Sequence, residues 1–239
     1  SGEYKLGVMI NVRKCLDKQM RSIVTGGAGF IGSHLVDRLL AMGHEVIVLD
    51  NFSTGRPENL AHVEKDIRVL ECDLQIRGNW MQQFADVDWV FHLAALADIV
   101  PSIQNPRSYF ESNVDGTFNV VQAAYDARVQ RVIYVGSSSS YGIPDSYPTS
   151  EIAEIRPQYP YALTKYIGEE LALHWAQVFE LPVVSLRFFN VYGPRSRTSG
   201  TYGAVFGVFL AQKLAGKPFT VVGDGKQTRD FTFVSDAVS

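Results

Sequence analysis

Two residues of this sequence have types and a spacing that could carry out chemistry. They are a tyrosine and a lysine four positions apart. Tyr161 and Lys165 lie in the segment Tyr-Ala-Leu-Thr-Lys, which opens a predicted helix extending to about Phe179. Residues at i and i+4 share one face of a helix. Because an ammonium group beside a phenol favours the phenolate, we expect the pKa of Tyr161 to fall from about 10 towards neutrality. Such a tyrosine is a general base for a hydroxyl proton, including that of a sugar.

A serine run lies at the end of a predicted strand at residues 132–135. Ser137 to Ser140 follow this strand directly. A serine hydroxyl there would share a substrate oxygen with Tyr161 and relay its proton. The alternative is a flexible loop, but strand ends in an open α/β sheet face the ligand crevice.

A glycine-rich turn near the N-terminus is typical of dinucleotide binding. Gly26, Gly29 and Gly32 join a short apolar strand to an amphipathic helix predicted at residues 31–42. The first glycine adopts a conformation closed to residues with a Cβ. The second lets N–H groups at a helix N-terminus approach a pyrophosphate, and the third allows close packing of helix on sheet. Asp50 ends the next predicted strand, at about the distance expected for a carboxylate that binds ribose hydroxyls. The alternative is a plain structural turn.

This carboxylate also selects between two cofactors. A negative charge at Asp50 would repel a 2′-phosphate, so the sequence favours NAD, although Arg56 keeps NADP open. Asp73 could accept a hydrogen bond from the adenine amino group, and a solvated loop acid is the alternative there. The predicted cofactor-binding residues are Gly26, Gly29, Phe30, Ile31, Gly32, Asp50, Asn51, Ser53, Gly55, Asp73, Leu74, Leu93, Ala94 and Ala95, together with Tyr161 and Lys165.

Composition excludes several classes of protein. The chain has 239 residues, of which 46% are hydrophobic. Its net charge of −3 argues against a basic surface that binds nucleic acid and against a polybasic patch that binds a membrane. Cys15 and Cys72 have no paired spacing, which argues against a disulfide scaffold or a zinc site and fits a reducing, cytoplasmic compartment. No apolar run approaches the length of a membrane span. We expect no metal site and interpret both cysteines as buried filler.

Predicted strands alternate with helices from Arg21 onward, which indicates an α/β fold with a Rossmann-type, doubly wound parallel sheet. His92, in one of these strands, is most simply a core histidine. The predicted division is an N-terminal extension or tag at residues 1–20, an NAD-binding domain at 21–190 and part of a small substrate-binding lobe at 191–239. The individual predictions include weak helical spacing at 6–16, helices at 108–127, 161–179 and 204–214, and strands at 44–49, 67–70, 89–93, 183–188 and 219–222.

Nine segments, found in order from Arg21 onward, carry a resemblance to a known family. They are TGGAGFIGSH, LDNFSTG, CDL, FHLAA, NVDGT, SSSSYG, YALTK, RFFNVYGP and GDGKQTRDF. With them the chain resembles the extended short-chain dehydrogenases/reductases, specifically the NAD-dependent nucleotide-sugar epimerases and dehydratases. The resemblance implies tight NAD binding and catalysis by Ser137, Tyr161 and Lys165, with Ser138 and Ser139 beside the substrate.

The resemblance also bears on partners. It implies that Asn190 and Arg229 contact the diphosphate of a nucleotide sugar, for which an amide and a guanidinium group are chemically suited. A surface salt bridge to Asp224 or Asp230 is the alternative for Arg229. The family further implies a homodimer in which helices at 108–127 and 161–179 pair with their symmetry mates.

The serine run discriminates between reactions within the family. The 4,6-dehydratases carry an Asp-Glu pair where this chain has Ser138 and Ser139, and the decarboxylases carry a glutamate in this stretch. The resemblance therefore favours a 4-epimerase of the UDP-glucose, UDP-N-acetylglucosamine or UDP-uronate type, with dehydration or decarboxylation as alternatives. Family members usually continue beyond the position of Ser239, so we expect a complete NAD site, an incomplete sugar site and, as a second hypothesis, an NAD-binding module without turnover.

Overall fold

Six parallel strands form the central sheet of the computed structural model, which describes residues 19–196, 205–221 and 223–239. The strands are β1 (Arg21–Thr25), β2 (Glu45–Asp50), β3 (Ile67–Glu71), β4 (Trp89–His92), β5 (Arg131–Ser137) and β6 (Val183–Phe188). Their order across the sheet is β3-β2-β1-β4-β5-β6, with every pair parallel. This order reverses direction between β1 and β4, which is the topological switch point of a doubly wound fold. The predicted Rossmann-type sheet is confirmed.

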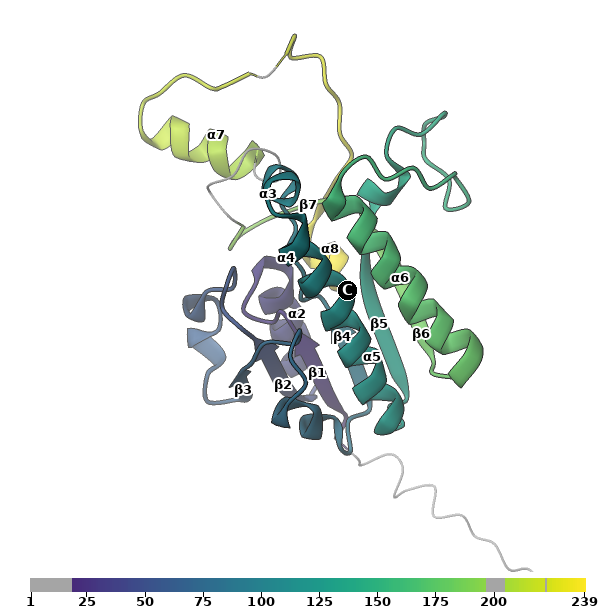
Figure 1. Cartoon of the computed structure of the whole chain (residues 1–239). Helices are drawn as coiled ribbons and strands as arrows, with labels where there is room; N and C mark the ends of the chain where they lie inside the picture. Colours follow the sequence, from purple (N-terminus) through teal and green to yellow (C-terminus); the bar gives the residue numbers. More distant parts are fainter. Residues whose placement is uncertain (1–18, 197–204, 222) are drawn as a thin grey trace, which may run out of the picture.

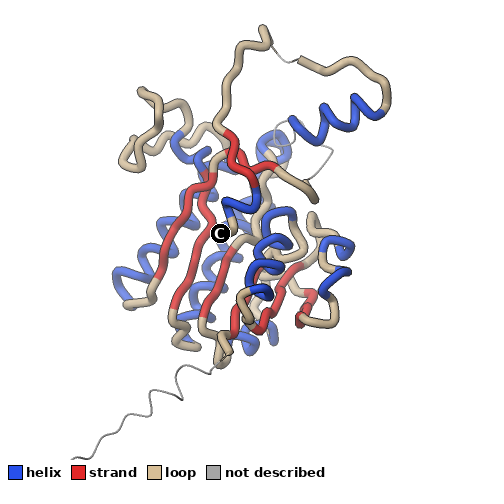
Figure 2. Tube along the Cα trace, turned by 180° about the vertical axis from the view of Figure 1, so that it is seen from behind, coloured by secondary structure: helices blue, strands red, loops and turns tan. Residues whose placement is uncertain are grey.

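Helices cover both faces of this sheet (Figures 1 and 2). One face carries α2 (Phe30–Ala41), and the other carries α5 (Gly116–Asp126) and α6 (Pro160–Phe179). Short 3₁₀ turns lie at η1 (Pro57–Asn59), η2 (Ala61–Val63), η3 (Asn79–Phe84) and η5 (Ser138–Tyr141). The three layers leave the carboxyl ends of the strands open at one edge, where the site described below is built.

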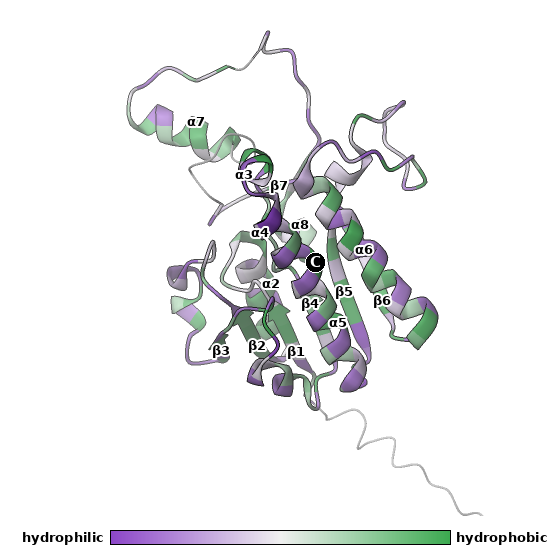
Figure 3. Cartoon of the chain, viewed as in Figure 1, coloured by the Kyte–Doolittle hydropathy of each residue, from purple (hydrophilic) through white to green (hydrophobic). Residues whose placement is uncertain are grey.

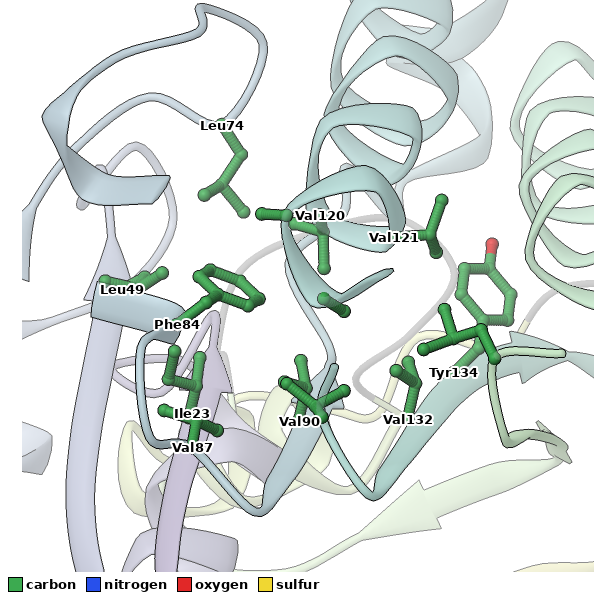
Figure 4. Close-up of a cluster of buried hydrophobic side chains, with 14 of the residues drawn as sticks. Ile23, Leu49, Leu74, Phe84, Val87, Val90, Val120, Val121, Val132 and Tyr134 are labelled. Atoms are coloured by element: carbon green, nitrogen blue, oxygen red, sulfur yellow. The ribbon is translucent and has the colours of Figure 1, made fainter. Parts of the chain in front are cut away.

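The strands are buried on both sides, which explains their nearly continuous apolar sequences. Successive side chains point to opposite faces of a strand, so Ile23 joins one hydrophobic cluster and Val24 joins the other. The larger cluster lies under α5, where Phe84 and Val120 meet the strands (Figure 4). Both layers are needed to hold the strand ends in place.

The helix predicted at residues 108–127 forms in three parts rather than one. It consists of α4 (Pro106–Phe110), a π-helical segment (Glu111–Asp115) and α5, and is preceded by α3 (Ile99–Gln104). Within the π-helical segment, the Asn113 side chain accepts from Leu96 N at 2.8 Å and donates to Leu96 O at 3.0 Å. The widened turn thus carries Asn113 to the loop that follows β4, a contact that helical periodicity alone does not predict.

The C-terminal residues form a second, smaller unit of secondary structure. A parallel pair, β7 (Asn190–Tyr192) and β8 (Phe231–Phe233), is followed by α8 (Val234–Ala237), which contacts α2. Helix α7 (Val205–Leu214) stands away from the sheet (Figure 1). The strand predicted at 219–222 is wrong for its described residues, because Phe219, Thr220 and Val221 pair with no other strand. The helical spacing predicted at 6–16 lies outside the described residues.

Candidate active site

The glycine turn joins β1 to α2 at the switch point of the sheet. Gly26 has φ +70°, and a Cβ there would lie 2.8 Å from the backbone nitrogen of Ala94. A Cβ on Gly32 would overlap the carbonyl oxygen of Gly26. Both glycines are therefore required by backbone conformation and close approach. Gly29 differs, because its φ is −74° and a Cβ there would have one neighbour within 4 Å, Gly26 O at 3.1 Å.

The N-terminus of α2 presents unpaired backbone donors beside Gly29. No side chain caps this end of the helix, so the N–H groups of its first turn have no intrahelical acceptor. Phe30, Ile31 and Gly32, which carry these groups, line a cleft of about 320 Å³. Free N–H groups together with the positive end of the helix dipole suit a phosphate. The glycine turn therefore fits the pyrophosphate of a dinucleotide.

The cleft collects most of the predicted cofactor-binding residues at the carboxyl ends of β1, β2, β3 and β4. Thirteen of the sixteen line it: Gly26, Gly29, Phe30, Ile31, Gly32, Asp50, Asn51, Ser53, Asp73, Leu74, Leu93, Ala94 and Ala95. Gly55, Tyr161 and Lys165 do not. A Cβ on Gly55 would lie 2.9 Å from the Asp50 carboxylate, so this glycine allows the loop to close on Asp50 and does not face the cleft itself.

Asp50 is held in place by the backbone around it. Its carboxylate accepts from Ala28 N at 2.9 Å and from Phe52 N at 2.8 Å, and the residue is 7% exposed. Burial raises the pKa of this carboxyl, and the backbone hydrogen bonds oppose that rise. Because each carboxylate oxygen has two acceptor positions, the group can still bind ribose hydroxyls.

Several residues of the cleft carried no signal in the sequence. Arg195 and Ser196 reach it from the segment after β7. The Arg195 guanidinium lies 2.8 Å from the carboxylate of Asp37 on α2, and His62 lies 2.7 Å from the same carboxylate. The contact between Arg195 and Asp37 joins residues more than a hundred positions apart, so no local pattern predicts it. Cys72 is half-buried and lines the cleft, so the prediction that it is a buried cysteine that only fills space in the core is only partly right. Cys15 lies outside the described residues.

Two of the three predicted catalytic residues, Ser137 and Tyr161, meet at the end of β5. The Tyr161 hydroxyl donates to Ser137 Oγ at 3.2 Å, and Ser137 Oγ lies 2.7 Å from Ser139 Oγ. Ser137 also accepts from Ser139 N at 3.2 Å, which caps the turn η5. The serine run therefore forms a structured turn, which places Ser137 and Ser139 beside Tyr161. This hydroxyl pair could bind one substrate oxygen.

The expected acidity of Tyr161 is wrong for this structure. Burial raises the pKa of the phenol and outweighs the hydrogen bonds to Ser137 and Ser139. Burial also lowers the pKa of Lys165 to about 7, against the opposing charge of Glu169. The Lys165 ammonium lies 4.5 Å from the centroid of the Tyr134 ring. The helical spacing predicted a shared face correctly, but it could not include the cost of burying both groups.

His92 is a core histidine, as expected. Its two ring nitrogens contact Thr25 Oγ1 at 2.7 Å and Thr117 Oγ1 at 2.9 Å. Burial and the nearby charge of Lys165 lower its pKa to about 3, so the ring is neutral. Among the described residues, no group of His, Cys, Asp or Glu could hold a metal ion.

Asn190 and Arg229 lie at the β7–β8 pair and do not line the cleft. The Asn190 amide donates to Asp230 O at 2.9 Å. Arg229 is exposed, donates to Thr228 O at 2.7 Å and makes no salt bridge with Asp224 or Asp230. The structure therefore brings these two residues near one another, outside the lining of the cleft.

The doubly wound sheet, the glycine turn and the Tyr-x-x-x-Lys helix define a dinucleotide-binding protein of the short-chain dehydrogenase/reductase class. The model of the NAD dependent epimerase/dehydratase family matches residues 22–239, and this chain belongs to that family. NAD is therefore its cofactor. The resemblance predicted from the nine sequence segments is confirmed.

The chain is similar to proteins with named reactions. It is 40% identical over 225 residues to a UDP-glucose 4-epimerase of Mycolicibacterium smegmatis, covering 92% of this chain and 71% of that protein. A solved UDP-N-acetylglucosamine 4-epimerase from Methanobrevibacter ruminantium superposes with a TM-score of 0.88 at 35% identity, covering 92% and 71% of the two chains. The Thermus thermophilus UDP-glucose 4-epimerase in complex with NAD gives a TM-score of 0.84 at 36% identity, covering 92% and 72%.

Proposed function

We propose that this chain is an NAD-dependent nucleotide-sugar 4-epimerase acting on a UDP-sugar of the glucose, N-acetylglucosamine or uronate type. The observation that carries the proposal is the hydroxyl pair at the end of β5, where Tyr161 Oη lies 3.2 Å from Ser137 Oγ. The turn that holds Ser137 consists of Ser138, Ser139, Ser140 and Tyr141. It offers hydroxyls and no carboxylate, which suits reversible oxidation of an alcohol better than elimination of water.

The chain's own groups would move the proton. Tyr161 takes the proton of the C4 hydroxyl as general base, and Ser137 shares the same oxygen and orients it. Lys165 lies one helical turn further on and supplies positive charge near the phenol. NAD, held by the residues of the cleft, would supply the hydride chemistry at C4 of the sugar.

The cofactor residues follow from the cleft. We propose that the N–H groups of Phe30, Ile31 and Gly32 hold the pyrophosphate, and that Asp50 holds the adenosine ribose. Leu93, Ala94 and Ala95 would form the wall beside the nicotinamide, since they line the cleft on the side of β4. Asn190 and Arg229 stay as proposed ligands of the sugar nucleotide's diphosphate. Asn190 lies at the end of the NAD-binding domain, and Arg229 lies in the proposed substrate lobe at residues 191–239.

We also propose a homodimer in the cytoplasm. Apolar side chains are exposed along α4, α5 and α6, among them Phe118 at 39%, Leu163 at 46% and Phe179 at 41%. Hydrophobic segments recur along α5 and α6 in Figure 3. Their rings and chains suit helix packing against a second copy. No helix among the described residues is both long and apolar enough to cross a bilayer. Sedimentation that shows only monomer at micromolar concentration would contradict the dimer.

Turnover with UDP-sugars tests the proposed reaction. The purified chain loaded with NAD should interconvert a UDP-hexose with its C4 epimer and give transient absorbance of the reduced cofactor. A stable 4-keto-6-deoxy product would instead identify a dehydratase, and release of carbon dioxide from a UDP-uronate a decarboxylase. Binding of NAD with neither absorbance nor product would leave a binding module without turnover.

A further inference from the structure

An ion pair with a buried carboxylate and a partly buried guanidinium lies one helical turn beyond Lys165. Glu169 on α6 is 3% exposed, and its carboxylate accepts from Arg187 Nε at 3.0 Å and from Arg187 Nη2 at 2.7 Å. Arg187 comes from β6, which lies beside β5 in the sheet. The pair therefore connects the helix of Tyr161 and Lys165 to the strands beneath it.

The backbone of β5 is shaped to admit this carboxylate. Gly136 is paired with Arg187 in the sheet, and a Cβ on Gly136 would lie 2.9 Å from Glu169 Oε2. A side chain at this position would displace the carboxylate. Gly136 also precedes Ser137 directly in β5.

Arg187 is itself fixed from the other side. Its Nη1 donates to the Tyr141 hydroxyl at 2.8 Å, and its guanidinium carbon lies 4.8 Å from the centroid of the Tyr141 ring. Tyr141 belongs to η5, the turn that Ser137 caps. Because the guanidinium has partners in two different elements, Glu169 on α6 and Tyr141 on η5, it cannot move away from Glu169 without breaking several contacts.

Stability is a weak reason for this arrangement. The desolvation of a buried carboxylate and guanidinium offsets most of their attraction, and apolar residues of similar size often serve as well. A fixed negative charge has a more specific effect on a second buried cation. Lys165 is that cation, since it is 5% exposed and shares the inner face of α6 with Glu169.

We propose that Glu169, locked in place by Arg187 and Tyr141, is a positioning residue whose carboxylate keeps the buried Lys165 side chain in its ammonium form beside Tyr161. The inference rests on the proposed function only for its effect on turnover. The charge relation itself is a property of the cofactor-free chain.

The groups around Lys165 agree with this role. Burial lowers the pKa of Lys165 to about 7, and Glu169 is the group that raises it. The other titratable groups in contact with Lys165 or acting on it are Tyr134 on β5 and His92 on β4. Tyr161 lies one helical turn before Lys165 on α6. Burial raises the pKa of Tyr134 and of Tyr161 and lowers that of His92, so all three are neutral near pH 7. Glu169, whose carboxylate is also paired with the Arg187 guanidinium, is thus the anion that acts on Lys165.

The decisive measurement is an NMR titration of the cofactor-free chain with isotope-labelled lysine side chains. We expect Glu169→Gln to lower the pKa of Lys165, so that its acid dissociation constant increases at least about tenfold. Glu169→Asp keeps the carboxylate and should restore most of the difference. Glu170→Gln, which removes an exposed acid next along the helix, should change nothing. Circular dichroism would establish that each variant is folded.

The sign of the change separates the inference from loose packing. If Glu169 served only to fill space, Glu169→Gln would admit water and raise the pKa of Lys165 towards its ordinary value. A rise, or no change, would overturn the inference. The same titration decides the question even if the wild-type chain turns over no sugar, an outcome that would count against the proposed function alone.

Turnover supplies the second test. With an active wild type, Glu169→Gln should leave NAD affinity unchanged and move the alkaline limb of the kcat profile to lower pH, because the ammonium form of Lys165 is lost at a lower pH. An unmoved alkaline limb would contradict the link between Lys165 charge and turnover.

Discussion

Replacement of Gly29 by alanine separates cofactor binding from folding. Gly29 has φ −74° and ψ −179°, which alanine adopts freely. Restriction of the unfolded chain by alanine adds about 0.4–1 kcal/mol of stability, and the contact at 3.1 Å with Gly26 O opposes it. We therefore expect the free energy of unfolding to stay within about 0.5 kcal/mol of the wild type.

Cofactor binding should change much more. The methyl group would stand in the cleft, beside the uncapped N–H groups at the start of α2. A hydrogen bond to a charged group contributes about 1.5–3 kcal/mol. Loss of one or two such bonds to the pyrophosphate weakens NAD binding by roughly 3 kcal/mol, or about a hundredfold in Kd. Calorimetric titration with NAD and urea denaturation of the same sample measure the two effects.

Gly43 offers the matched control. It has φ +83°, and no heavy atom lies within 4 Å of a Cβ built there. Gly43→Ala should cost about 1–2 kcal/mol of stability through backbone conformation alone, with NAD affinity unchanged. The two variants thus have opposite signatures. If Gly29→Ala bound NAD as tightly as the wild type, the assignment of the pyrophosphate to this turn would be wrong.

Three further predictions concern the groups around the cleft. Tyr161→Phe should lower kcat by about 10²–10⁴-fold with little change in NAD affinity. If steady-state kinetics showed retained activity, Tyr161 would not be the general base. Folding lowers the pKa of His92 from 6.5 to about 3. Protonation of this histidine therefore leaves the free energy of unfolding unchanged above pH 6.5 and reduces it as the pH falls below 6.5, by at most about 1.4 kcal/mol per pH unit. His92→Gln should flatten this slope in urea titrations at several pH values, and an equal slope would assign the loss to other groups. Asp37→Asn should increase the rate of NAD release several-fold, because Asp37 binds Arg195 at the cleft. Stopped-flow fluorescence measures this rate, and an unchanged rate would show that the contact does not retain the cofactor.

Local patterns predicted the parts of the fold and site that depend on local structure. The alternation of strands and helices gave the sheet correctly, and the glycine spacing with Asp50 located the cleft at the switch point. Each of these features requires only short-range geometry, such as a turn conformation or a strand end. The strand predicted at 219–222 had no such support, because a strand needs a partner and β7 pairs with β8 instead.

Electrostatics at the hydroxyl cluster depends on contacts that no spacing reveals. The separation of Lys165 and Glu169 by four residues is visible in the sequence, yet their charges are set by burial and by Arg187, which arrives from a neighbouring strand. Its position opposite Gly136 follows from the register of β5 and β6. A tyrosine–lysine pair alone predicts a phenol of lowered pKa. In the folded chain, burial instead raises the pKa of the Tyr161 phenol and lowers that of Lys165 to about 7. The acidity of Tyr161 must then come from charges brought to the site, and Glu169 acts on it indirectly by preserving the ammonium of Lys165.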